Sequence, residues 1–564
     1  MKRTRTRTRM RSVCFLLILL MLLPTLISCV EEERNNSADD DEPKSSSTKK
    51  ASGGFLDDII DELYPLDTGD GYLSAPDSSS SEVGGSSDTT DNSSSNLESS
   101  SDKVQDTSRP NDTTTDTPTV PSITFDGADY YVLSAGNKAY NDFEYQSTES
   151  TVLGRAQYQR IKDIDLLFKV KIITNIKQDM NSNGSGAGFK AVSMSYIAGD
   201  PTYNIAIIGA YDVAALAYSC YLEDINSVPY VDVENDWWDQ DANTAFTIDG
   251  LLFFTNGPLT AAHSDVTSVI YMNRDLAKEK LPGTDLYQLV KSGKWTVDKF
   301  GEYVKRVSDD INGDGVMDQN DRYGLYVWQD SIVGMLGAAN TKTATVGTDG
   351  KLSLTLYNNN SLSMFNKFTE IAYNKNHSLM YQKYTSAQLG GGVLNCFEDD
   401  RALFWITNSA NTKALSDMDM SLGILPYPKL SESQNKYYST ILPSSAQFIC
   451  VPMIQDSFDM TGVITEALAY LGKTMVWPAY YEQSIVGAFA KDGGVADMLD
   501  IIYGSYNYDI GAYYKVGDYN SAIMQLIRSE SANFSATYQM NMVRAEVEID
   551  TINANYQNVI NEFR

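Results

Sequence analysis

Oxygen-bearing side chains recur at regular spacing between Asp310 and Asp321. With Asp310 as position 1, side-chain oxygens fall at positions 1, 3, 5, 9 and 12 and a backbone carbonyl is available at position 7: Asp310, Asn312, Asp314, Asp318, Asp321 and Val316. Gly315, at position 6, permits the sharp turn that such a loop needs. Oxygens of this kind are the ligands that Ca2+ prefers. We therefore expect a calcium loop over 310–321, with a solvated acidic turn as the alternative.

The residues on either side of this loop indicate a structural ion. Thr296 predicts the cap of a helix that reaches about Val307 and leads into the loop. The segment 323–328 has the pattern of a strand, not of a second helix, and the sequence contains no second loop of this kind. Asp321 stands where a longer Glu usually supplies two oxygens, so its side chain reaches less far. We expect the ion to act as a clamp and not as a sensor.

The other reactive residue types argue against an enzyme. The two histidines, His263 and His377, are far apart in sequence, which disfavours a histidine-rich zinc site or a histidine-based triad. Beyond residue 29 the sequence contains three cysteines, Cys220, Cys396 and Cys450. An odd number predicts buried free thiols instead of a full disulfide framework. Acidic residues are plentiful, but none lies in a recognisable catalytic motif. A surface glycoside hydrolase or lyase, which needs two facing carboxylates, stays open as an alternative.

Residues 1–28 have the composition of a signal peptide. Basic residues precede an apolar run from Val13 to Ile27, which is shorter than the ~20 residues of a comfortable membrane span. The run ends Leu26-Ile27-Ser28-Cys29, which resembles the lipobox of bacterial lipoproteins. The resemblance implies a lipidated Cys29 that anchors the chain in the bilayer, at the cell surface on the outer face of the cytoplasmic membrane. The alternative is an ordinary secretory signal with a chance cysteine.

Residues 29–121 form a segment of different composition. Ser, Thr, Asp, Gly and Asn dominate it, so it cannot bury enough apolar surface to offset chain entropy. We expect a disordered linker. The formal net charge of the whole chain is −30, and the leader removes only basic residues, so the mature protein would be more acidic still. Such a surface repels nucleic acid. We expect a soluble, tethered monomer with no nucleic-acid partner.

The chain from about Ile123 alternates between strand-like and helix-like segments. Strands are expected at 123–132, 170–173 and 203–208, with helices between them. This order predicts an α/β fold with parallel strands. A chain of 564 residues is too long for a single core, so two domains or two lobes are expected.

The order of short motifs in this chain resembles that of bacterial extracellular solute-binding proteins of family 1, the substrate-capturing lipoproteins of ABC importers. The matching segments are Ala198–Asp200, Val228–Asp232, Trp237–Asp239, Tyr271–Leu276, Gly293–Thr296, Tyr323–Gly324, Ala402–Trp405, Gly423–Lys429, Pro478–Glu482, Met498–Ile502 and Tyr508–Gly511. Each motif alone is weak, and their order behind a lipobox makes the resemblance specific. It covers the chain from about Ile123 to about Tyr514.

The resemblance implies a two-lobed clamp of the periplasmic-binding-protein type II, with hinge strands between the lobes. The first lobe would begin with residues 122–265. Residues 266–445 would form the second lobe, which carries the calcium loop. Residues 446–564 would return to the first lobe and end in helices.

The resemblance also implies a ligand and a partner. Importers of this family mostly take carbohydrates, so a sugar or oligosaccharide is expected, with ABC permease subunits as the membrane partner. Sugar sites combine aromatic faces with polar groups, and α/β clefts bind ligands beyond strand ends. The residues expected in the site are Trp328, Asp330, Trp405, Asn408, Tyr480 and Glu482. Trp237 and Trp238 are assigned to the core. A peptide or other non-sugar ligand, and an adhesin or sensor with the same fold, are the alternatives.

Overall fold

The structure is a computed structural model, and it describes most of the chain from residue 120 onward. The described residues are 120–137, 142–178, 185–260, 264–416, 418, 420–481, 489 and 494–563. All of them belong to one compact unit. The predicted leader, Cys29, the linker up to residue 119, Glu482 and His263 lie outside the described residues. Within the described ranges, no helix is both long and apolar enough to cross a membrane.

The first sheet has the strand order β2-β1-β3-β13-β4. Its strands are β1 (Ala128–Gly136), β2 (Val170–Gln178), β3 (Ile205–Gly209), β4 (Phe254–Thr255) and β13 (Gln447–Cys450). β1 runs parallel to β2 and β3, whereas β13 runs antiparallel to β3 and β4. All five residues of β3 are buried, as expected for a central strand covered on both faces.

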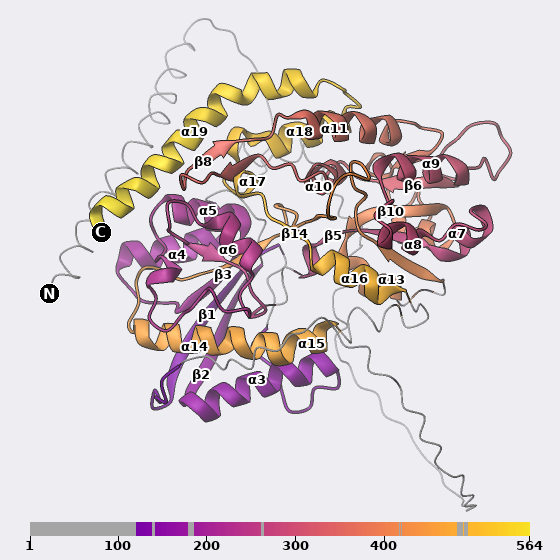
Figure 1. The fold of residues 1–564 in the computed structure, drawn as a ribbon. Helices are drawn as coiled ribbons and strands as arrows, with labels where there is room; N and C mark the ends of the chain where they lie inside the picture. Colours follow the sequence, from indigo (N-terminus) through magenta and orange to yellow (C-terminus); the bar gives the residue numbers. More distant parts are fainter. Residues whose placement is uncertain are drawn as a thin grey trace, which may run out of the picture. The chain divides into compact units, whose positions relative to one another are not determined.

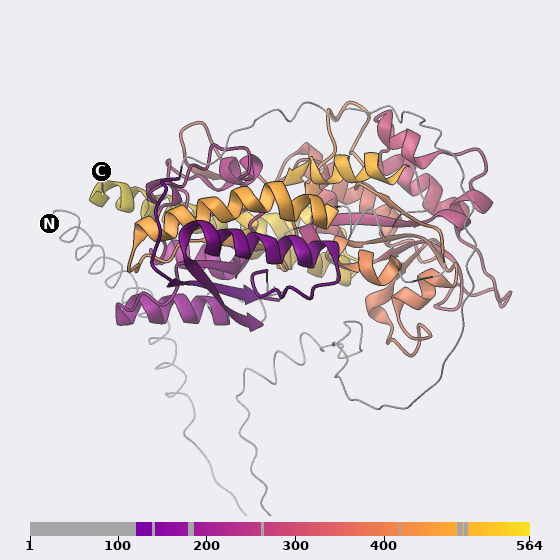
Figure 2. The ribbon, with the colours of Figure 1, turned by 90° about the horizontal axis from the view of Figure 1, so that it is seen from below.

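Helices cover both faces of the first sheet (Figure 1). The helices that contact this sheet or each other are α3 (Val152–Phe168), α4 (Ala187–Ala198), α5 (Ala210–Tyr218), α6 (Gln240–Phe246) and α14 (Phe458–Leu471). Figure 2 shows α3 and α14 side by side on one face, although they are about three hundred residues apart in the sequence. Thr151 caps α3 by accepting from the amide of Gly154 at 3.0 Å.

The second sheet has the order β11-β5-β10-β6-β9. Its strands are β5 (Ser268–Asn273), β6 (Tyr323–Val327), β9 (Ser378–Met380), β10 (Ala402–Asn408) and β11 (Leu422–Leu425). β9, β6 and β10 are parallel, and β5 is antiparallel to both of its neighbours. The helices between these strands are α7 (Arg274–Lys280), α8 (Leu286–Lys291), α9 (Val297–Val307), α10 (Ser331–Ala338), α11 (Asn359–Ala372), α12 (Val393–Glu398) and α13 (Thr412–Ser416).

The helix predicted before the calcium loop is α9. Thr296 caps it by accepting from the amide of Lys299, and Phe300, Val304 and Val307 are buried on its inner face. The three cysteines of the described residues, Cys220, Cys396 and Cys450, are free and buried, which confirms that prediction.

Two connections join the sheets. The chain passes from the end of β4 to the start of β5, and it returns from the end of β11 to the start of β13. In the first sheet, β4 runs parallel to β3, so the connections meet this sheet at the edge where β3 ends. In the second sheet, β5 begins opposite Asn408 at the end of β10, so the connections meet that sheet at the edge where β6, β9 and β10 end. This observation identifies the edges at which α/β proteins bind ligands.

The last part of the chain is mostly helical. It contains α15 (Trp477–Tyr480), α16 (Val495–Tyr503), α17 (Ile510–Tyr513), α18 (Tyr519–Arg528) and α19 (Phe534–Phe563). A short strand, β14 (Tyr506–Asn507), pairs with β12 (Ser439–Thr440) of the returning connection. A small hairpin of β7 (Ala344–Val346) and β8 (Leu352–Leu354) contacts α19, where Asn553 bonds both the amide and the carbonyl of Leu352 at 2.9 Å.

Candidate functional site

A pocket of about 370 Å³ lies beside the connection that leaves the first sheet. It is lined by five aromatic residues and by polar or small residues from four separate segments: Trp237, Trp238, Trp477, Tyr503 and Tyr506, with Asp236, Asp239, Gln240, Asp241, Gly257, Pro258, Lys473 and Gly504. We call this site the aromatic pocket. Its volume lies within the usual range of small-molecule sites, about 300–1,000 Å³.

The backbone ties the aromatic pocket to the ligand-binding edge of the first sheet. Asn256 directly follows β4, and its carbonyl accepts from the amide of Asp239 at 3.1 Å. The side chain of Asn256 donates to the hydroxyl of Tyr508 at 2.8 Å, next to β14. The pocket therefore forms where the chain leaves the sheet and where the C-terminal segment comes back to it.

One buried carboxylate holds the two adjacent tryptophans. Glu466 of α14 accepts from the indole Nε1 of Trp237 and of Trp238, each at 3.0 Å. It also accepts from the side chain of Asn235 at 3.0 Å and from the amide of Asp232 at 3.3 Å. Burial raises the pKa of Glu466, and these donors act in the opposite direction. Both indoles are thereby fixed from behind while their segment borders the pocket.

Half-buried rings form the opposite wall. Trp477 meets Tyr503 edge to face, with centroids 5.5 Å apart at 80°, and Tyr503 meets Tyr506 at 6.1 Å and 85°. All three rings are partly exposed. Partly exposed aromatic faces are suited to the apolar faces of sugar rings or of other flat ligands.

Polar groups complete the pocket. Asp239 accepts from the hydroxyl of Tyr508 at 2.5 Å and from the amide of Ala242 at 2.9 Å, and burial raises the pKa of its carboxyl group. Asp236 and Asp241 are exposed, and Lys473 is half-buried. These groups can accept from, or donate to, the hydroxyl groups of a ligand.

A π-helical stretch, Gly472–Val476, links α14 to α15; Lys473 lies within this stretch and Trp477 directly follows it. A Cβ atom at Gly472 would lie 2.6 Å from the carbonyl carbon of Pro258, so only glycine allows this helix to approach the Gly257-Pro258 segment. π-helical turns occur frequently at functional sites. Here the turn brings Lys473 and Trp477 to the same pocket.

The sequence-predicted site residues of the second sheet lie elsewhere. Trp405 is on β10 and is only 3% exposed, with ring centroids 6.1 Å from Tyr271 and 6.5 Å from Tyr381. Trp328 follows β6 and lies 4.9 Å from the ring of Tyr381. We call Tyr271, Trp328, Tyr381 and Trp405 the aromatic cluster. Neither tryptophan lines the aromatic pocket.

The two polar residues predicted beside the aromatic cluster have local roles. Asn408 ends β10 and accepts from the amide of Ala410 at 3.2 Å, so its oxygen caps the next turn. Asp330 precedes α10, and burial raises the pKa of its carboxyl group to about 6. Neither residue lines the aromatic pocket, so their ligand-binding role stays a prediction.

Tyr480 supports the aromatic pocket from behind. Its ring stacks on Trp477 with centroids 5.7 Å apart at 20°, and its hydroxyl donates to Asp265 at 2.6 Å. The assignment of Trp237 and Trp238 to the core agrees with their exposures of 3% and 2%, but both also line the pocket. Sequence reasoning missed Lys473, Trp477, Tyr503 and Tyr506. The adjacent Trp237 and Trp238, followed by Asp239, were the one feature of the local sequence that could have indicated this pocket.

The 310–321 segment is a tight loop with its ends joined. Asp309 and Arg322 exchange backbone hydrogen bonds of 3.0 and 3.1 Å. The carboxylate of Asp310 accepts from the amides of Gly313 and Gly315 at 2.7 and 2.8 Å. Gly313 and Gly315 have positive φ angles of 73° and 81°, which explains the need for glycine at both positions.

Asp321, at position 12, is fully buried and closes the loop from inside. Its two oxygens accept from the amides of Ile311 at 3.1 Å and Asp318 at 2.9 Å. The carboxylate of Asp314 accepts from the amide of Val316 at 2.8 Å. Among the described residues, no three His, Cys, Asp or Glu side chains are grouped closely enough to hold a metal ion. The oxygen donors have the right chemistry for Ca2+, but they bond the loop's own amides.

Comparisons with known proteins extend this picture. No protein-family model and no curated protein matches the chain. The cyclic α-maltosyl-1,6-maltose binding protein from Arthrobacter globiformis matches in structure with a TM-score of 0.50 and 11% identity, over 75% of this chain and 98% of that one. An ABC substrate-binding protein from Listeria monocytogenes in complex with cycloalternan has a TM-score of 0.45 and 14% identity, over 77% and 100%. UgpB from Mycobacterium tuberculosis, in complex with glycerophosphocholine, has a TM-score of 0.48 and 12% identity, over 75% of this chain and 98% of that one.

The Listeria neighbour is an ABC substrate-binding protein, and the Arthrobacter neighbour is a binding protein for a cyclic maltosyl-maltose. The chain has a mixed α/β fold with two sheets that resembles the fold of the Arthrobacter binding protein, and this confirms the predicted fold class. At these identities the comparison establishes the fold, and the ligand has to be argued from the site.

Proposed function

We propose that this protein captures a sugar or oligosaccharide outside the cell and delivers it to an ABC importer. The observation that carries this proposal is the aromatic pocket, which lies beside the connection between the sheets of a two-lobe binding fold. It combines five aromatic side chains with carboxylates and an ammonium group. Carbohydrate recognition needs this combination, because ring faces bury apolar C–H surface and polar groups orient hydroxyls.

In the proposed mechanism, the ligand rests against Trp477, Tyr503 and Tyr506 while Asp236, Asp241 or Lys473 contacts its hydroxyl groups. No bond in the ligand is made or broken. Ligand that contacts both lobes favours the closed state by its differential affinity for that state, and the permease would read the closed form. Glu466 contributes by holding Trp237 and Trp238 before the ligand arrives.

The proposal includes anchoring at Cys29, on the outer face of the cytoplasmic membrane. Acyl chains contribute ~0.8 kcal/mol per buried methylene, so two or more chains would hold the protein at the bilayer. The linker expected from the sequence has ~90 residues, and a random coil of that length would have an end-to-end distance of ~50 Å, enough to keep the folded part near a permease. Metabolic labelling with a fatty acid, which Cys29→Ser should abolish, would test the anchor.

A melting experiment with a sugar panel tests the ligand. A bound sugar should raise the melting temperature without being cleaved. Trp477→Ala should weaken that sugar's affinity by about tenfold to a hundredfold, since one side of the stacking wall is lost. Trp328→Ala, at another half-buried tryptophan that lies outside the pocket, is the matched control and should retain the affinity.

The outcomes separate the alternatives. Release of a shortened product would identify a glycoside hydrolase or lyase. If only peptides or other non-sugar solutes raised the melting temperature, the ligand would belong to that class and not to the sugars. Loss of sugar binding in Trp328→Ala but not in Trp477→Ala would move the site to the aromatic cluster.

We also propose that Ca2+ binds the 310–321 loop as a structural clamp. The supporting observations are the spacing of the oxygen donors, the two glycines with positive φ angles and the joined ends of the loop. Ca2+ should raise the melting temperature by a few degrees, and Asp314→Ala should abolish the increase. Asp349→Ala is the control, because Asp349 also accepts from a loop amide, that of Lys351 at 3.2 Å, in an exposed turn elsewhere. Equal melting with Ca2+ and with chelator would contradict this proposal.

A further inference from the structure

The C-terminal helix α19 contacts elements of both lobes. It has 30 residues, which corresponds to a length of about 45 Å. Figure 1 shows α19 running from the side of α11 and α18 towards α5. α11 packs on β9 of the second sheet, whereas α5 packs on β3 and β13 of the first sheet. The helix begins after Tyr514, near which the sequence resemblance to family 1 solute-binding proteins ends.

The first turns of α19 are attached to the second lobe. The ring of Phe534 stacks on that of Phe365 of α11, with centroids 4.9 Å apart at 23°. The ring of Tyr538 stacks on that of Tyr357, which precedes α11, at 4.6 Å and 24°. The hydroxyl groups of Tyr357 and Ser535 are also hydrogen-bonded at 2.9 Å. Stacked rings of this kind stabilise a contact beyond the area that they bury.

The last turns of α19 are attached to the first lobe. Tyr556 is 2% exposed, and its ring lies 5.1 Å from that of Phe253, which precedes β4. The side chain of Asn555 donates to the backbone carbonyl of Tyr218, at the end of α5, at 3.4 Å. Asn555 is 6% exposed, so this hydrogen bond satisfies a buried amide. The two ends of one helix are thus held by two different lobes.

The hairpin of β7 and β8 reinforces the attachment of α19 to the first lobe. Asp249 lies between α6 and β4, and its amide donates to the carbonyl of Gly350 in the hairpin turn at 2.8 Å. The carboxylate of Asp249 accepts from the side chain of Gln557 of α19 at 2.5 Å. Asn553 bonds both the amide and the carbonyl of Leu352, each at 2.9 Å. The hairpin and α19 are therefore bonded to each other and to the first lobe.

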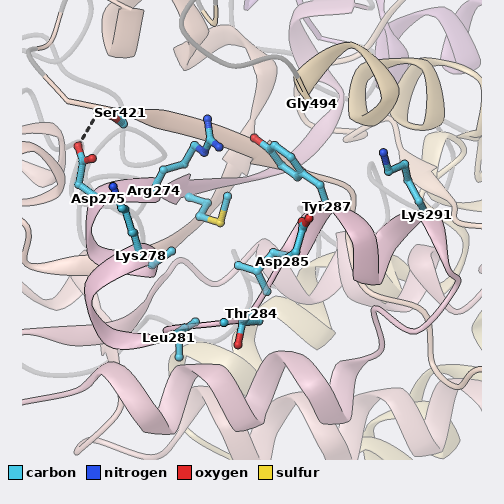
Figure 3. A pocket seen from close by; sticks show the side chains of 14 residues that line it. Arg274, Asp275, Lys278, Leu281, Thr284, Asp285, Tyr287, Lys291, Ser421 and Gly494 are labelled. Carbon is cyan, nitrogen blue, oxygen red and sulfur yellow. Dashed lines mark hydrogen bonds between the residues drawn. The ribbon is translucent and has the colours of Figure 1, made fainter.

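A change in the angle between the lobes has to disturb one end of α19. The backbone hydrogen bonds fix the length of the helix, so α19 cannot stretch while the lobes rotate. None of its described residues lines the aromatic pocket. The same holds for a second cavity, of about 670 Å³, which α7 and α8 largely line (Figure 3). An effect of α19 on a bound molecule must therefore pass through the positions of the lobes.

We propose that α19 holds the two lobes at a fixed angle, and that the lobes rotate only when one end of the helix is released. The contacts of α19 then set how often the ligand-free protein visits other lobe angles. This role does not depend on the solute that is assigned to the aromatic pocket, because it concerns the protein without ligand. It gives the C-terminal helix a conformational role in addition to its packing.

Two double variants with identical replacements test this role. Asn553→Ala/Asn555→Ala removes the three hydrogen bonds that these side chains make. Each bond contributes about fivefold to an equilibrium constant, so their loss should raise the population of other lobe angles by up to about a hundredfold. Asn558→Ala/Asn561→Ala makes the same replacements at exposed positions of the same helix and is the control. Gln557→Ala, which removes one bond, is a milder variant and should raise that population by about fivefold.

The lobe angle is measured by double electron–electron resonance between spin labels on the two lobes. Gln159→Cys on α3 and Lys294→Cys, between α8 and α9, place the labels at exposed positions. Cys14 and Cys29 are replaced by serine in every sample. The three cysteines of the described residues are buried, which protects them from labelling.

The parent protein and the control should each give one narrow distance between the labels. Asn553→Ala/Asn555→Ala should give a broader distribution, and Gln557→Ala a smaller change of the same kind. Circular dichroism shows whether each variant is folded, and Gln557→Ala alone decides the question if the double variant does not fold. Equal distributions in the parent protein and in the loosened variants, or equal broadening in the control, would overturn the proposal.

Discussion

The aromatic pocket and the aromatic cluster contain the same residue types but differ in how their rings are packed. In the cluster, the ring of Trp405 is enclosed by Tyr271, Tyr381 and Phe397 at 6.1 to 6.5 Å, and 3% of the residue is exposed. In the pocket, Trp477 is supported by Tyr480 on one side and remains partly exposed on the other. Trp477 thus keeps exposed ring surface that a ligand could contact, whereas Trp405 does not.

The polar groups of the two regions differ in the same way. The indole nitrogens of Trp237 and Trp238 both donate to Glu466, which fixes the rings beside a cavity. The indole nitrogen of Trp405 is buried and has no hydrogen-bond partner among the described residues. Hydrogen bonding thus orients Trp237 and Trp238, whereas packing against other rings holds Trp405. Three substitutions test this difference, from the largest expected effect to the smallest.

Trp405→Ala should destabilise the protein by about 3–5 kcal/mol, because it removes a nearly fully buried ring from the second sheet. Urea unfolding followed by circular dichroism measures the change. Trp405→Phe keeps most of the packing and should lose less. A stable Trp405→Ala variant that no longer binds the solute would show that the cluster, and not the pocket, is the site.

Glu466→Gln should have an intermediate effect. Glutamine presents one oxygen and one donor group where the carboxylate accepts from four donors, so at least one indole N–H loses its partner. We expect a loss of about 2 kcal/mol in the free energy of unfolding and a weaker affinity for the solute. Glu302→Gln, at an exposed glutamate paired with Lys299, is the control. Unchanged affinity in a destabilised Glu466→Gln variant would limit Glu466 to a role in stability.

Asp330→Asn should change the pH dependence of stability. Burial raises the pKa of Asp330 from 3.8 to about 6, so this group's contribution to stability is complete below about pH 4 and is lost as the pH rises through 6. Replacing the carboxyl group with an amide should stabilise the protein above pH 6 by about 1 kcal/mol, because the partly exposed side chain retains some solvation.

The measurement for Asp330→Asn is urea unfolding at pH 4 and pH 7, with Asp349→Asn as an exposed control. A gain in stability at pH 4 that equals the gain at pH 7 would mean that the ionised carboxylate is not the cause.

The sequence by itself determined the features that are written in contiguous residues. The Thr296 cap and apolar spacing give α9, the strand pattern gives β6, and the glycines of the 310–321 segment give its tight turns. Periodicity also gave the α/β class, and the order of short motifs led to the two-lobe fold. These features follow from interactions over a few residues, which the local sequence specifies.

Only the tertiary structure decided which aromatic residues meet at a pocket. Glu466 reaches Trp237 across 229 residues of chain, and Tyr508 reaches Asp239 across 269. No local pattern distinguishes Trp477, which borders a cavity, from Trp405, which other rings enclose. The reason is physical: the exposure of a ring depends on every segment that packs against it, and those segments come together only when the sheets and the C-terminal helices assemble.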